Sequence, residues 1–178
     1  MYACRPSLNG GVGLGQSAAL DVGVSWTDSD GFPTRATDDI DRGYDNLSAN
    51  VALRADVGAA EVTVQHWRTA GTSEYSDFFL APVDQDYVTS TTAAEVRLPV
   101  GAASEARVSV NHLEDEIQQN QSPDFLETDR DTLDAQYDWQ LSKVHGLGVG
   151  AMYSRERARS ESYGEGFKSD TDTVNVHV

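Results

Sequence analysis

The sequence predicts an all-β fold, an antiparallel meander of about nine strands. The first observation is that apolar and polar residues alternate over most of the chain, as they do in strands whose successive side chains face opposite sides of a sheet. The second is that short links containing Gly or Pro alternate with long acidic links. The third is that no stretch approaches the eighteen or so consecutive apolar residues of a membrane-spanning helix.

The first predicted strands cover residues 8–13 and 18–28. The earlier segment alternates weakly, and a Gly-rich link at 14–17 follows it. In the second segment apolar residues occupy the even positions up to Trp26. The pattern then stops and Asp residues cluster, which predicts a long polar loop over residues 29–44.

Residues 46–68 show the two-residue period most clearly and are predicted to form one β-hairpin. Leu47, Val51 and Leu53 alternate with polar residues, and Val57 and Gly58 turn the chain into a second strand of the same period. One side of this hairpin therefore meets an apolar medium and the other meets water. The pattern lasts about ten residues per strand, which is the length that a tilted transmembrane β-strand needs.

The chain then repeats this unit. Further strands are predicted at residues 87–98, 105–114, 133–141, 147–153 and 174–178. Short links are predicted at 99–101 and 142–145, and long loops at 69–86, at 115–130 and in a segment rich in Ser, Glu and Arg after residue 153. Outer-membrane barrels have such short periplasmic turns and long external loops, whereas a soluble sandwich mixes its loop lengths.

The alternation also assigns side chains to two faces. Trp26 and Trp139 lie on the apolar parity at opposite ends of their strands, as two interfacial aromatic girdles require. The residues expected to face lipid are Leu20, Val22, Val24, Leu47, Ala49, Val51, Leu53, Val62, Val64, Leu133, Tyr137, Leu141, Val149 and Tyr153. Those expected to face the lumen are Asn50, Arg54, Glu61, Gln65, Arg97, Arg107, Gln136 and Gln140.

The composition excludes several classes of function. The formal net charge of -16, from 29 acidic and 13 basic residues, argues against a nucleic-acid partner. The hydrophobic fraction of 39% is low for a packed core but sufficient for a barrel with a wet lumen. No catalytic constellation is present, so the chain is not expected to be an enzyme. The four histidines lack ligand spacing and are interpreted as strand or turn residues, and Cys4 has no partner for an intrachain disulfide.

Several stretches of the chain, beginning with the run from Leu8 to Asn50, resemble a known family. The run Ser-Trp-Thr-Asp-Ser-Asp-Gly-Phe at 25–32 and the run Asp-Arg-Gly-Tyr-Asp-Asn at 41–46 resemble early barrel strands of TonB-dependent outer-membrane receptors. The most similar branch is that of the vitamin B12 (cobalamin) receptors. Residues 73–78 and 134–154 also resemble this family, so the resemblance covers nearly the whole chain.

The resemblance implies a place in the cell outer membrane, as part of a 22-stranded β-barrel closed by an N-terminal plug. It implies uptake of a scarce chelate, such as a corrinoid or a siderophore, powered by the TonB complex. The sequence shows no plug, TonB box or signal peptide. Residues 1–178 are therefore expected to form a partial barrel domain in contact with outer-membrane lipid, which would reach the TonB complex only through a missing plug domain.

Two other functions fit the same alternation. One is a self-contained small outer-membrane β-barrel that acts as a pore, an adhesin or a scaffold. The other is a soluble β-rich binding module. Closure of the sheet between its first and last strands would favour the small barrel, and a polar outer face would favour the soluble module.

Calcium is the one metal that the resemblance implies. Aspartates in neighbouring external loops of vitamin B12 receptors bind calcium, and Asp28 and Asp30 are the positions that match. Asp38, Asp39 and Asp41 are neighbours without a match. The same acidic composition also arises in loops that only need to be soluble. No Glu closes a twelve-residue EF-hand here, so a calcium site would have to be built between loops.

Overall fold

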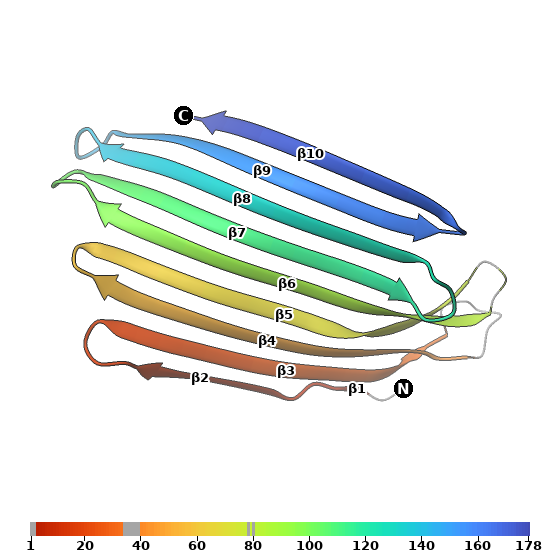
Figure 1. The fold of residues 1–178 in the computed structure, drawn as a ribbon. Helices are drawn as coiled ribbons and strands as arrows, with labels where there is room; N and C mark the ends of the chain where they lie inside the picture. The colour runs from red at the N-terminus through yellow and green to blue at the C-terminus, as the bar shows by residue number, and fades with distance from the viewer. Residues whose placement is uncertain (1–2, 34–39, 78, 80) are drawn as a thin grey trace.

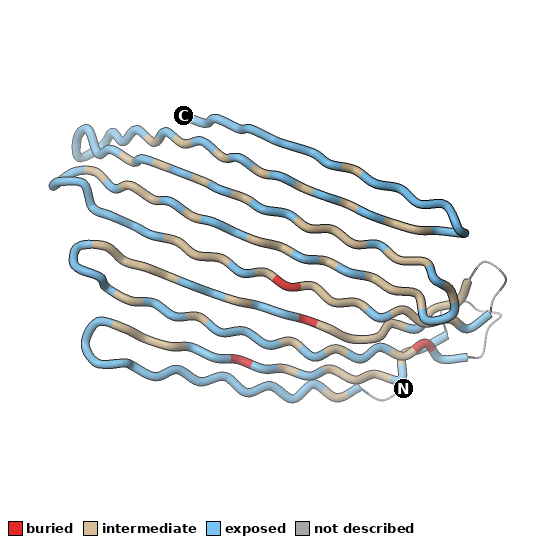
Figure 2. The backbone as a smooth tube through the Cα atoms, viewed as in Figure 1, coloured by how far each residue is buried: buried red, intermediate tan, exposed pale blue. Residues whose placement is uncertain are grey.

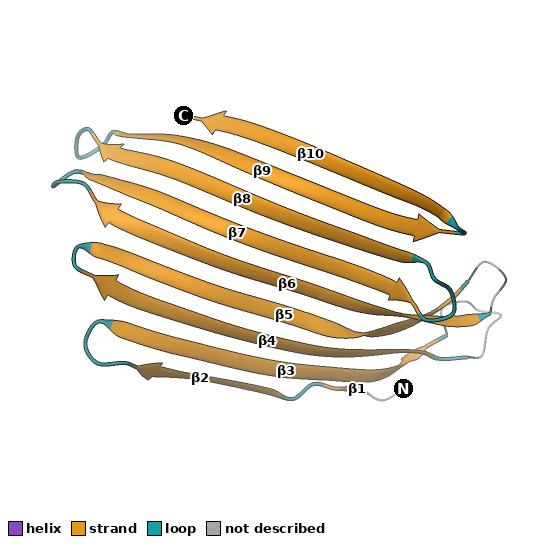
Figure 3. Cartoon of the chain, in the orientation of Figure 1, coloured by secondary structure: helices purple, strands orange, loops and turns teal. Residues whose placement is uncertain are grey.

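The computed structural model describes residues 3–33, 40–77, 79 and 81–178. These residues form a single layer of ten antiparallel strands, which confirms the predicted all-β meander (Figure 1). The strands are β1 (Ala3–Cys4), β2 (Ser7–Gly13), β3 (Ala18–Phe32), β4 (Arg42–Val57), β5 (Ala60–Ser76), β6 (Pro82–Pro99), β7 (Ser104–Gln119), β8 (Phe125–Gln140), β9 (Gly146–Ser162) and β10 (Glu165–His177). The described residues contain no helix (Figure 3), and hence none that could cross a membrane.

From β2 onward each described strand pairs with its neighbour in sequence. The order along the sheet is β3 to β10 without a crossover, and β1 and β2 both pair with β3, one after the other along its length. Among the described strands, β2 and β10 therefore have no partner on their outer sides. The sheet is open and is not closed into a barrel.

This sheet has no second layer and no core. Among the residues that the structure describes, no hydrophobic side chain is buried, and the buried polar residues are Arg42, Thr69 and Ser90 (Figure 2). A soluble domain of this length normally buries a hydrophobic core against another layer of secondary structure. The apolar side chains of this sheet remain uncovered within the chain itself.

The strand register confirms that the two predicted sets of residues lie on opposite faces. Leu53 pairs with Leu20 and with Val64, and Tyr153 pairs with Leu133, so these apolar side chains share one face. We call it the banded face. Arg107 pairs with Arg97 and Gln136 on the other side, which we call the polar face. Leu141 lies just beyond β8, in the link to β9.

The predicted long loops are mostly wrong, because the strands continue past the apolar pattern. Of the predicted loop 69–86, only residues 77–81 lie between strands, and of 115–130 only 120–124. The segment after residue 153 is also strand, with a turn at Tyr163 and Gly164 between β9 and β10. Of the predicted loop 29–44, β3 and β4 occupy both ends, and 34–39 lie outside the described residues.

Polar pairing explains these longer strands. Beyond the apolar pattern both faces of the sheet are polar, so hydrophobic alternation ends although the backbone hydrogen bonds continue. Arg130 on β8 pairs with Glu156 on β9, its Nε lying 2.7 Å from Oε2. Tyr163 and Gly164 both have positive φ, of 52° and 78°, as a two-residue type I′ hairpin requires. The links at the two ends of the sheet therefore do not differ in length in the way that the sequence predicted.

Candidate functional site

An apolar band crosses the banded face near the short turns. Val22 is 50% exposed and Leu133 is 48% exposed, and each has apolar cross-strand partners. Measured along the strands, the band is long on β4, where it runs from Leu47 to Val57, and short on β7, where it runs from Ala106 to Val110. A contiguous exposed apolar surface of this kind marks contact with a membrane or another protein.

Two tryptophans mark opposite ends of this band. Trp26 on β3 pairs with Leu47 on β4, at the end away from the short turns. Trp139 on β8 pairs with Leu147 and lies beside the short link to β9. Both side chains are on the banded face, whereas Trp67 pairs with Asn50 on the polar face. This placement agrees with the two girdles that the sequence predicted.

A charged belt follows the apolar band on the same face of β7 to β10. We define the charged belt as His112, Glu114, Glu127, Asp129, Asp131, Arg155, Arg157, Arg159, Asp170 and Asp172. Arg155 and Arg157 of β9 lie between carboxylates of β8 and β10, and Arg159 lies between Glu127 and Lys168. Arg159 forms an ion pair with Glu127, and Arg157 Nε lies 3.8 Å from Asp170 Oδ1. Tyr153, at the edge of the apolar band, donates to Asp172 over 2.7 Å.

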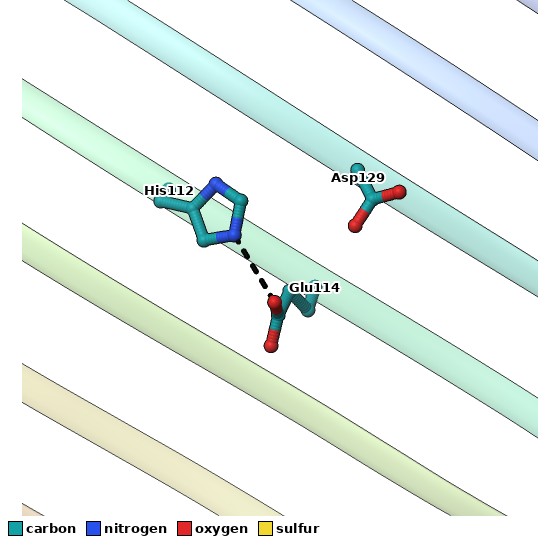
Figure 4. Close-up of side chains that lie close together, drawn as sticks. All are labelled: His112, Glu114 and Asp129. Carbon is teal, nitrogen blue, oxygen red and sulfur yellow. Dashed lines mark hydrogen bonds and ion pairs between the residues drawn. The ribbon is translucent and has the colours of Figure 1, made fainter.

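Within this belt, His112, Glu114 and Asp129 form a cluster that could hold a metal ion (Figure 4). One ligand atom from each lies within 4.8 Å of the others. His112 Nε2 lies 3.2 Å from Glu114 Oε1, and His112 Nδ1 lies 2.7 Å from Asp131 Oδ1. His112 is a strand residue, as the sequence predicted, but the register brings it beside acidic residues that its spacing in the sequence did not indicate.

Sequence reasoning missed this cluster because it placed Asp129 in a loop. A signal was nevertheless present, since His112 and Glu114 are two residues apart on a strand and must share a face. Asp129 joins them because it is the direct cross-strand partner of Glu114 in the β7–β8 pair. That pairing could not be derived from alternation, which ends before residue 112 on β7.

The polar face carries a hydrogen-bonded network at its middle. The Tyr87 hydroxyl lies 2.8 Å from the Tyr44 hydroxyl and 2.8 Å from Asn46 Oδ1. The two tyrosine rings stack with their centroids 6.1 Å apart. Asn46 also contacts Thr69 and donates to Ser48 over 2.9 Å. Polar side chains from β4, β5 and β6 are thus held in fixed positions on this face.

A hollow of about 750 Å³ lies at the loop end of the polar face, on β5 to β9. Its lining includes aromatic, aliphatic and amide side chains, notably Tyr75, Val83, Ile117, Gln119 and Leu126. The Tyr75 hydroxyl donates to Gln119 Oε1 over 2.5 Å, and Gln119 in turn donates to Gln85 over 3.0 Å. The hollow is open to solvent and combines apolar walls with oriented polar groups.

Asp84 fastens the neighbouring link 120–124 to β6. Asn120 donates to Asp84 Oδ2 over 3.2 Å, and the Gln121 amide donates to Oδ1. In return the Asp84 backbone N–H donates to Gln121 Oε1 over 3.0 Å. The hydrogen bonds from Gln121 and then Asn120 lower the pKa of Asp84 because they stabilise its ionised form.

The residues predicted to bind calcium lie at the end of β3. Asp28 pairs with Cys4 and Asp45, and Asp30 lies where the β3–β4 register shifts. Within the described part of the chain, neither joins two further His, Cys, Asp or Glu residues at metal-binding distance. Asp38 and Asp39 lie outside the described residues. Calcium binding at Asp28 and Asp30 therefore stays a prediction.

Comparison with known proteins gives no family for this chain. Neither a scan against protein-family models nor a search of curated proteins finds a match.

Proposed function

We propose that this chain forms part of the wall of a TonB-dependent outer-membrane receptor that takes up a corrinoid or a similar scarce chelate. The observation that carries the proposal is a single open sheet with an uncovered apolar band on one face and polar side chains on the other. Lipid covers such a band in a barrel wall, and the polar face then lines a wet lumen. The resemblance at residues 25–32 and 41–46 supplies the receptor family.

The geometry of the polar face supports a role in ligand contact. The resemblance implies that the link between β3 and β4 is external, and the hollow around Tyr75 and Gln119, at the same end of the sheet, would then lie where a ligand enters the lumen. Tyrosine rings and amide groups can bind the apolar edges and the amide side chains of a corrinoid. Energised release would act through the plug of the whole receptor, so the proposal assigns only wall and ligand contacts to this chain.

The two alternatives fit the structure less well. A soluble binding module would expose polar side chains on both faces, but an exposed apolar band crosses the banded face beside its charged belt. A small closed barrel needs its first and last strands to pair, but β2 and β10 do not pair with each other in the described structure.

The three tryptophans test the membrane part of the proposal. Three variants that each keep one tryptophan, the others being changed to Phe, are refolded as full chains into vesicles containing brominated lipids. We expect strong quenching of Trp26 and Trp139 fluorescence, because these rings meet lipid, and weak quenching of Trp67 on the polar face. Equal quenching of all three rings would contradict the assignment of faces.

Ligand contact is tested by titrating the refolded chain with a corrinoid or a ferric siderophore. Tyr75→Ala removes an aromatic wall of the hollow and should weaken binding about tenfold or more. Tyr153→Phe is the matched control, because Tyr153 is on the banded face and should leave binding unchanged. Binding that ignores Tyr75→Ala, or no binding to the wild-type chain, would count against the proposed ligand site.

A further inference from the structure

The cluster of His112, Glu114 and Asp129 has the donor atoms of a transition-metal site. It offers one imidazole nitrogen and two carboxylates, from β7 and β8. Zinc accepts this combination readily, whereas calcium prefers oxygen ligands alone. The imidazole distinguishes this cluster from the rest of the charged belt, although Asp129 and Asp131 also pair with Arg157 and Arg155 on β9.

The distance between its first two ligand atoms already suits a shared metal. Bonds of about 2.0 to 2.1 Å at a tetrahedral angle place two ligand atoms about 3.3 to 3.4 Å apart. His112 Nε2 and Glu114 Oε1 lie 3.2 Å apart. Asp129 offers a carboxylate oxygen within 4.8 Å of a ligand atom of each of these two residues, so its side chain has to move closer before all three bind one ion. A fourth position remains for water.

A further carboxylate orients the imidazole. Asp131 Oδ1 lies 2.7 Å from His112 Nδ1, across the β7–β8 pair. In the metal-free chain Nε2 also faces the Glu114 carboxylate, so a metal that binds Nε2 replaces the proton there while Asp131 keeps the proton on Nδ1. Histidines that bind metals commonly have such a carboxylate partner, which fixes both the tautomer and the ring orientation.

We propose that His112 Nε2, Glu114 and Asp129 bind a zinc-class divalent cation at the edge of the apolar band, with Asp131 as the positioning residue. The cation joins β7 to β8 and draws together carboxylates that otherwise repel each other. The side chains of His112 and Glu114 are 44% and 60% exposed, so an ion reaches them without any opening of the sheet. The site requires only the β7–β8 register and is independent of the proposed transport function.

The test uses the full chain refolded in detergent, with Cys4→Ser to remove the free thiol. Zinc chloride is titrated while the ¹⁵N resonances of the histidine side chains are recorded. We expect one equivalent of zinc to shift Nε2 of His112, with Nδ1 protonated, and to leave His66, His145 and His177 unchanged. A wild-type chain in which the His112 nitrogens do not respond would overturn the proposal without any need for a variant.

Variants then assign the ligands, with folding checked by circular dichroism. His112→Gln and Glu114→Gln should each weaken zinc binding at least about tenfold, and Asp131→Asn about 10- to 100-fold. His66→Gln is the matched control, because His66 and His112 both pair with Thr92 on the same face. Glu116→Gln controls for loss of a nearby carboxylate. Unchanged affinity in His112→Gln, or equal loss in His66→Gln, would overturn the proposal.

Discussion

At the scale of single residues, Gly71 decides how closely β4, β5 and β6 approach on the polar face. A Cβ atom built at Gly71 would lie 2.0 Å from the Asp45 carbonyl oxygen and 2.8 Å from the Tyr87 hydroxyl. Tyr87 therefore crosses over Gly71 to reach Tyr44 and Asn46 on β4. The sequence shows a glycine inside a strand, but only the register identifies the ring that covers it.

Gly71→Ala should accordingly destabilise the sheet, because either the β4 backbone or the Tyr87 ring must move. We expect the free energy of unfolding to fall by about 1–3 kcal/mol, the usual cost of overpacking. Urea titration of the chain refolded in detergent measures this change. Gly10→Ala is the control, since a Cβ there meets no atom within 4 Å. An equal effect of both substitutions would show that the contact with Tyr87 and Asp45 is unimportant.

At the scale of the strand, alternation predicted the parts of each element that carry the apolar band and failed beyond them. The hairpin predicted at 46–68 is confirmed as β4 and β5, and its faces are correct. The continuation of β7 to Gln119 and of β8 back to Phe125 was not predictable in this way. Those ends are held by the backbone ladder and by polar pairs, which leave no two-residue period of hydrophobicity. The cluster around His112 was missed for the same reason.

The link between β7 and β8 should loosen in acid, because Asp84 holds it through acceptor contacts. Its folded-state pKa is lowered, so its stabilising effect is complete above the ordinary carboxyl range and is lost as the pH falls through the lowered pKa. Amide exchange at residues 120–124 should therefore accelerate in acid beyond its intrinsic change with pH. In Asp84→Asn this additional acceleration in acid should be absent. The amides of residues 120–124 should instead exchange faster than in the wild-type chain at neutral pH. An acceleration in acid that persists in Asp84→Asn would assign the effect to another group.

At the scale of the whole molecule, neighbouring residues of a strand lie on opposite faces of the sheet and therefore tolerate different side chains. Val51 lies in the apolar band, between Val22 and His66, whereas Asn50 next to it lies between Gly23 and Trp67 on the polar face. In the proposed barrel wall, an arginine at position 51 would be carried into lipid, and one at position 50 would face water. The sequence predicted this division of the whole sheet correctly, since it depends only on parity.

Val51→Arg should destabilise the chain folded in lipid vesicles. We expect its free energy of unfolding to fall by about 2–4 kcal/mol, the cost of a charge near the bilayer midplane. Asn50→Arg, one residue away, should change it by less than about 1 kcal/mol. Urea titration of vesicle-bound chain, followed by tryptophan fluorescence, compares the two. The reverse order, with Asn50→Arg the more damaging, would mean that the banded face does not face lipid.

The nearest-neighbour pairing of the strands also bears on how such a chain can change in evolution. From β4 onward every described strand contacts only the strands before and after it, so each hairpin is a self-contained repeat of the sheet. A hairpin begins and ends at the same end of the sheet. Duplicating or deleting one therefore leaves the faces and the registers of all other strands unchanged. Barrels of different circumference can therefore descend from one ancestor by the gain or loss of hairpins.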